Sequence, residues 1–62
     1  MTVGTLVTSL SHPKAIGEVI RINDAGALTI QFTTPPSETL PYAHVCTEIW
    51  PASDLGQLNP LT

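Results

Sequence analysis

Three side chains able to bind a metal ion stand two residues apart late in the sequence: His44, Cys46 and Glu48. On a strand, residues two apart point to the same face, but such side chains lie roughly 7 Å from each other. Zinc needs ligands at about 2.0–2.3 Å around one point, generally from more than one element. His12 would add a ligand only if its loop folded over this segment. We therefore expect no metal site.

A nucleophilic role for Cys46 would require His44 or His12 as base, in a concave pocket that orients a substrate. A lone cysteine on a strand usually behaves as a small hydrophobic residue. The interior of a very small barrel is filled with side chains, which leaves no internal site. We expect no enzyme activity from a monomer, no catalytic residue and no cofactor; an active site could form only between subunits of a homo-oligomer.

Two aromatic residues, Tyr42 and Trp50, flank this segment. If Val45 and Ile49 face inward, Trp50 faces outward and could anchor a protein interface. At such interfaces Trp and Tyr are enriched among the residues that carry binding energy. The alternative, that Trp50 covers the end of the core over Leu55, stays open. The predicted partner-binding residues are Tyr42, His44, Glu48 and Trp50.

Length and composition indicate one folded domain. The chain has 62 residues, 42% of them hydrophobic and 11% charged, which is too apolar for a disordered chain. A domain of this size buries only roughly 60% of its unfolded surface. With so few charges, its surface favours association with a partner or a second copy.

Charge and cysteine content restrict the partners and the compartment. Lys14 and Arg21 stand against five acidic residues, for a formal net charge of −3, whereas nucleic-acid binding needs a basic surface. A single cysteine allows no internal disulfide, which favours the cytoplasm. The first ten residues lack a basic region, and no run of eighteen apolar residues occurs, so neither export nor membrane insertion is expected.

The clearest structural signal is the segment 27–33, where apolar and polar residues alternate at the period of a half-buried strand. Its inward residues are Leu28, Ile30 and Phe32.

The residues before this strand predict a hairpin over 16–33. The turn at 23–26 has Gly26 available for positive φ, and the preceding run is β-branched. Val19 and Ile22 cannot both point inward unless a bulge or bend separates them.

The remaining segments predict short strands and loops. A first strand covers 5–10 and is followed by an irregular connection over 11–14, whose proline keeps the preceding residue extended. Three prolines make 34–41 an exposed loop. Alternation predicts a fourth strand over 43–50.

The C-terminal part predicts a 3₁₀ turn over 51–55 whose Leu55 plugs the end of a barrel. A very short strand at 57–58 and a loose tail over 59–62 follow. The expected fold is all-β: one domain over 1–62, with its core at about 4–56, of four to five short antiparallel strands closed into a small barrel with a C-terminal 3₁₀ turn.

Three segments carry a resemblance to a known superfamily: Gly4-Thr5-Leu6-Val7, His12-Pro13-Lys14-Ala15-Ile16-Gly17-Glu18-Val19 and Leu28-Thr29-Ile30-Gln31-Phe32. With the final strand leading into Asp54-Leu55, the chain resembles the SH3-like barrels, particularly Tudor and KOW-like members. This resemblance implies the fold but not one function, because the fold hosts many binding roles.

Members of that superfamily suggest several functions. KOW-type domains that contact RNA are more basic than this chain. Small accessory subunits of photosystem I and of ferredoxin-thioredoxin reductase are similar in size and layout. The plasmid-borne dihydrofolate reductases use a Val-Gln-Ile-Tyr segment where this chain has Thr47-Glu48-Ile49-Trp50, so that activity is not expected.

The sequence thus predicts a non-catalytic protein-binding module of the cytoplasm, an accessory or regulatory subunit docking on a larger protein complex. Two alternatives stay open: a homo-oligomer with a ligand or catalytic site between subunits, and a nucleic-acid-binding domain using Lys14 and Arg21.

Overall fold

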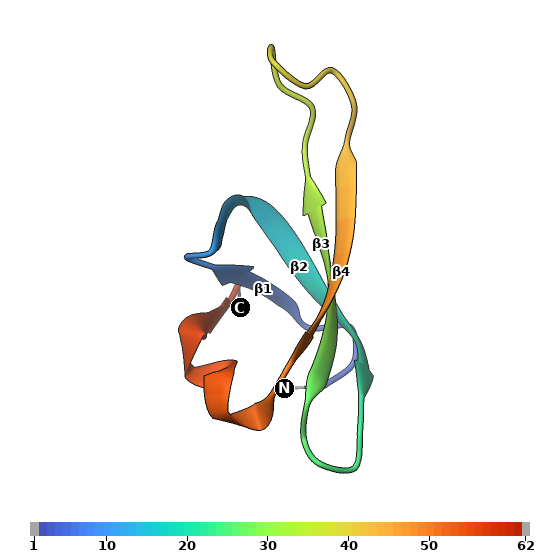
Figure 1. The fold of residues 1–62 in the computed structure, drawn as a ribbon, viewed down its shortest axis with the longest axis vertical. Helices are drawn as coiled ribbons and strands as arrows, with labels where there is room; N and C mark the ends of the chain where they lie inside the picture. The colour runs from blue at the N-terminus through green and yellow to red at the C-terminus, as the bar shows by residue number, and fades with distance from the viewer. Residues whose placement is uncertain (1, 62) are drawn as a thin grey trace.

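The structure, a computed structural model, describes residues 2–61 (Figure 1). Five strands and one 3₁₀ helix follow one another along the chain. They are β1 (Leu6–Ser9), β2 (His12–Ile22), β3 (Leu28–Thr34), β4 (His44–Trp50), η1 (Ala52–Gln57) and β5 (Leu58–Pro60). The predicted all-β class, with a 3₁₀ segment near the C-terminus, is confirmed.

The strands form one antiparallel sheet in the order β4-β3-β2-β1-β5. The eleven residues of β2 pair with β1 along one edge and with β3 along the other. Within residues 2–61, β4 and β5 stand at opposite ends of this order and do not pair, so the sheet is not the closed barrel that we expected. Closure would need β5 to reach β4, but β5 has only three residues and hydrogen-bonds along β1 instead.

One small core lies on the inner face of the sheet. The alternation in 27–33 predicts it correctly, because the three inward residues of β3 are all buried. Leu55 of η1 packs against this core, as predicted. The buried hydrophobic residues are Val7, Ala15, Val19, Leu28, Ile30, Phe32, Trp50 and Leu58.

The β2–β3 hairpin closes as its turn residues predict. The Asn23 side-chain oxygen accepts hydrogen bonds from the backbone N–H groups of Ala25 and Ala27, each at 2.9 Å. Gly26 has φ +83°, a conformation that glycine adopts without steric cost. The predicted irregularity in β2 is a register shift between Val19 and Arg21.

Two segments are more regular than the sequence predicts. Pro13 lies inside β2, which begins at His12, because Ser9 already pairs with His12 across a tight turn. The predicted loose tail is wrong for residues 59 and 60, which belong to β5. The Leu61 N–H also bonds to the Leu6 carbonyl at 3.0 Å. Thr62 lies outside the described residues.

The loop between β3 and β4 is the most extended part of the molecule. Figure 1 shows it at the far end of the β3–β4 hairpin, projecting away from the rest of the sheet. Within it a tight turn forms, in which the Ser37 N–H donates to the Leu40 carbonyl at 2.7 Å. Leu40 and Tyr42 are exposed there. The exposed apolar side chains of this loop, Leu40 and Tyr42, are therefore accessible to a partner.

Candidate functional site: the edge strand β4

The orientation of β4 differs from the one we considered for a binding site. Val45 and Ile49 point outward, with 54% and 72% of their surface exposed, while Trp50 is 9% exposed and belongs to the core. Directly opposite residues in neighbouring strands share a face, and Trp50 lies opposite Leu28, an inward residue. The expectation of an outward Trp50 is therefore corrected: the alternative, in which the indole covers the core beside Leu55, agrees with this structure.

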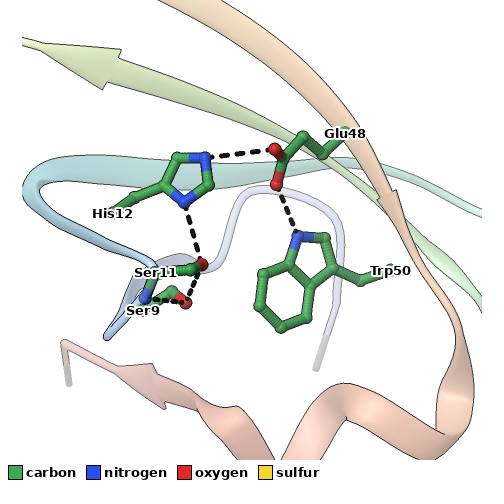
Figure 2. A network of polar contacts seen from close by, with 5 residues as sticks. All are labelled: Ser9, Ser11, His12, Glu48 and Trp50. Atoms are coloured by element: carbon green, nitrogen blue, oxygen red, sulfur yellow. Dashed lines mark hydrogen bonds and ion pairs between the residues drawn. The ribbon is translucent and has the colours of Figure 1, made fainter.

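A chain of polar contacts crosses the inner face from β4 to the turn between β1 and β2 (Figure 2). One Glu48 oxygen accepts a hydrogen bond from the Trp50 indole N–H at 3.1 Å. The other lies 3.1 Å from the Nε2 atom of His12. His12 Nδ1 is 2.9 Å from the Ser11 hydroxyl, which is 2.9 Å from the hydroxyl of the buried Ser9. Glu48 thus links the core indole to the β1–β2 turn.

His12 is also held by packing. Its ring stacks on the buried Phe32 ring, with centroids 4.3 Å apart and planes inclined by 27°. Because the carboxylate only accepts hydrogen bonds, Nε2 carries a hydrogen, and in the neutral imidazole Nδ1 then accepts from Ser11. This arrangement connects β4 to an element with which it shares no backbone pairing in the described residues.

A hydroxyl, an imidazole and a carboxylate in series resemble the groups of nucleophilic catalysis. Such a set needs a pocket that holds a substrate next to the hydroxyl. Residues 2–61 enclose no pocket, and Ser11 already bonds to Ser9. We assign these contacts a structural role, as a side-chain link that holds β4 over the core.

The residues first considered as metal ligands do not gather at one point. Among the described residues, no three His, Cys, Asp or Glu side chains lie close enough to hold one ion. Cys46 is exposed and lies opposite Phe32, while His44 is exposed at the distal end of β4, opposite Thr34. His12 does reach β4, through Glu48. The sequence has no signal for that contact, because the two residues meet only when β2 and β4 flank β3.

Replacing Glu48 tests this link. Glu48→Ala removes both contacts, and we expect the free energy of unfolding to fall by about 1–2 kcal/mol, since the pair is partly exposed to solvent. Glu48→Gln keeps an acceptor for the indole, so about half that loss is expected. Urea denaturation followed by Trp50 fluorescence measures both. Glu38→Ala, at an exposed loop carboxylate, is the matched control and should change the urea midpoint little. A Glu48→Ala midpoint equal to that of Glu38→Ala would contradict the assigned role.

The outward side chains of β2, β3 and β4 form a second surface, here called the outer face. Its rows are fixed by the strand register, in which Thr33 lies between Ile16 and Val45. Apolar groups and threonines dominate it, and among the described residues its charged groups are Glu18 and Arg21, which lie opposite Gln31 and Thr29. The outer face consists of Ile16, Glu18, Ile20, Arg21, Thr29, Gln31, Thr33, Val45, Thr47 and Ile49.

The other residues named from the sequence are dispersed. Tyr42 is 77% exposed, two positions before β4 begins. Lys14 and Arg21 lie seven positions apart on β2, roughly 20 Å along an extended strand, so they do not form a compact basic patch. Of the four predicted partner-binding residues, Tyr42 and His44 are exposed, Glu48 is partly exposed, and Trp50 is buried.

No protein-family model, no curated protein and no solved structure matches this chain. Within residues 2–61, no helix is long and apolar enough to cross a membrane.

Proposed function

We propose that this chain is a small protein-binding module, an accessory or regulatory subunit that docks on a larger protein complex in the cytoplasm. The proposal is carried by one observation: the outer face and the adjoining loop expose large apolar side chains beside very few charges. An apolar surface of this kind marks an interaction site more often than a solvated one. A charged ligand such as nucleic acid would find little there to bind.

Part of the proposal is that the fold is of the SH3-like kind. The order of elements supports it: a short first strand, a long second strand shared by two neighbours, a hairpin, a fourth strand and then a 3₁₀ segment before a last short strand. Small folds of this type expose strand edges and loops to their partners while the interior is filled by side chains.

Docking would use the outer face near the loop. The row of Ile16, Thr33 and Val45 lies next to the N-terminal end of β4, because Val45 is the second residue of that strand. Tyr42 lies in the loop two residues before β4 begins. Tyrosine supplies a large contact area at low cost in side-chain entropy. Trp50 does not contact the partner in this proposal. Its buried indole holds β4 against the core and so keeps the strand in place.

An affinity pull-down from the host lysate, with and without nuclease, tests the proposal. We expect a defined protein that survives nuclease and whose capture falls at least about tenfold with Tyr42→Ala/Ile16→Ser. Leu10→Ser is the matched control, because Leu10 is an exposed apolar residue at the β1–β2 turn, outside the proposed surface. Circular dichroism confirms that each variant is folded.

Equal capture by the double variant would contradict the proposed surface. Capture that disappears with nuclease would contradict a protein partner and favour nucleic acid instead.

A further inference from the structure

The two edges of the sheet differ in how they are protected against pairing. The β5 edge has three residues and includes Pro60, which has no N–H to donate. The β4 edge has seven residues, contains no proline, lysine or arginine, and pairs with β3 alone in the described chain. Natural sheets usually protect long edges with charge, proline or a covering element. Glu48, the one acidic residue of β4, points to the inner face and is bound to His12.

We infer that β4 pairs antiparallel with β4 of a second copy, with Thr47 on the two-fold axis. This inference deepens the proposed function by naming what covers the β4 edge, and it rests on that function only for the use of the outer face.

The residue order in β4 favours this pairing. With Thr47 opposite Thr47 of the second copy, all seven residues of each β4 find a partner. Val45 of each copy then lies opposite Ile49 of the other, so the pair occurs two times in the dimer. Both side chains are exposed in the single chain. Cross-strand pairs of branched apolar residues stabilise a sheet.

Charge selects the register. When Thr47 is central, each Glu48 lies opposite Cys46 of the second copy, so no like charges oppose each other. A pairing centred on Glu48 would place two carboxylates side by side, which is destabilising. A pairing centred on Cys46 would use only five residues of each β4. The sequence of the strand is therefore complementary to itself in one register.

Such a dimer joins two outer faces. Its sheet would run β2-β3-β4-β4-β3-β2 across the two-fold axis, since β2, β3 and β4 are neighbours in each copy. A partner would then meet one wide apolar surface with the two Tyr42 loops at opposite ends of the paired strands. Two-fold dimers that use the same surface of both copies are the commonest oligomers of soluble proteins.

Charge exchange at the edge tests the inference. Wild-type protein should have a mass in light scattering of twice the 6.6 kDa chain, falling toward one chain on dilution. Val45→Lys/Ile49→Lys and Val45→Glu/Ile49→Glu should each weaken self-association about 100-fold, because like charges then oppose each other. An equimolar mixture of the two variants should recover the dimer. Ile16→Lys/Ile20→Lys, on β2 away from the edge, should remain dimeric.

Cross-linking tests the register. In a Cys46→Ser background, Thr47→Cys should form an intermolecular disulfide with oxidised glutathione, because residues on the axis face each other. Val45→Cys in the same background should not, since position 45 faces position 49.

A wild-type chain that stays monomeric at millimolar concentration would overturn the inference, as would a lysine variant and a glutamate variant that each remain dimeric. Neither result would affect the pull-down above, whose variants at Tyr42 and Ile16 lie outside the β4 edge.

Discussion

Trp50→Ala is expected to destabilise the whole fold rather than remove one binding contact. The indole is nearly buried, lies with its centroid 6.3 Å from the Phe32 ring and donates to Glu48. Truncating a buried Trp to Ala costs about 3–5 kcal/mol. At roughly 0.05–0.15 kcal/mol per residue, a domain of this size has a total stability of about 3–9 kcal/mol. A thermal melt followed by circular dichroism should show the midpoint lowered by at least about 15 °C.

Tyr42→Ala is the matched control for Trp50, because Tyr42 is an aromatic residue that is largely exposed. Its melt should differ little from that of the wild-type chain. Trp50→Phe keeps an aromatic ring but loses the indole N–H, so a smaller loss of about 1 kcal/mol is expected. An unchanged melt for Trp50→Ala would place the indole outside the core. Because Trp50→Ala destabilises the fold, loss of a partner in a pull-down with this variant does not identify a binding contact.

Gly17→Ala is expected to destabilise the protein by about 1–3 kcal/mol, although it adds only one methyl group. A Cβ atom built at Gly17 would lie 2.7 Å from Ile30 Cγ2 and 2.9 Å from Phe32 Cε1. Both neighbours are fully buried, so neither can move without disturbing the rest of the core. Gly17 lies directly opposite Phe32 in the β2–β3 pair, so an added methyl group would press on the inward side chains of β3 and push β2 away from it. The midpoint of urea denaturation measures this effect.

Gly56→Ala is the control for Gly17. A Cβ at Gly56 would have no heavy atom within 4 Å, and its φ is not in the left-handed region. Its free energy of unfolding should stay within about 0.5 kcal/mol of the wild-type value. Gly17→Val should be worse than Gly17→Ala. A Gly17→Ala protein as stable as Gly56→Ala would show that the core has room that this structure does not have.

The residues that stabilise the fold and those that we propose for association lie in different parts of one hairpin. The inner face of β3 and β4 holds the core and the link through Glu48, while the outer face and the β4 edge lack any cover in the described residues. A substitution at Val45 or Ile49 can therefore change association with little effect on folding. This separation is what makes the charge-exchange variants interpretable.

Local signals were sufficient to predict most of the elements. The alternation in 27–33 predicts the buried face of β3, and the residues at 23–26 predict the turn that closes the hairpin. Both depend on neighbours in the chain: side-chain direction alternates along a strand, and a turn is set by its own residues. The short 3₁₀ segment with Leu55 against the core also follows from the residues themselves.

The buried face of β4 could not be predicted in this way. Val45 and Ile49 on one side, and Trp50 on the other, are equally compatible with a half-buried strand, and a shift by one residue exchanges the faces. Pairing with β3 decides between them, because Trp50 lies opposite Leu28. The contact between His12 and Glu48, the pairing of residues 59 and 60 with β1, and the open order of the sheet likewise depend on residues distant in sequence. Sequence patterns describe what each segment can bury, whereas the partner that buries it is chosen only when all five strands pack around one core.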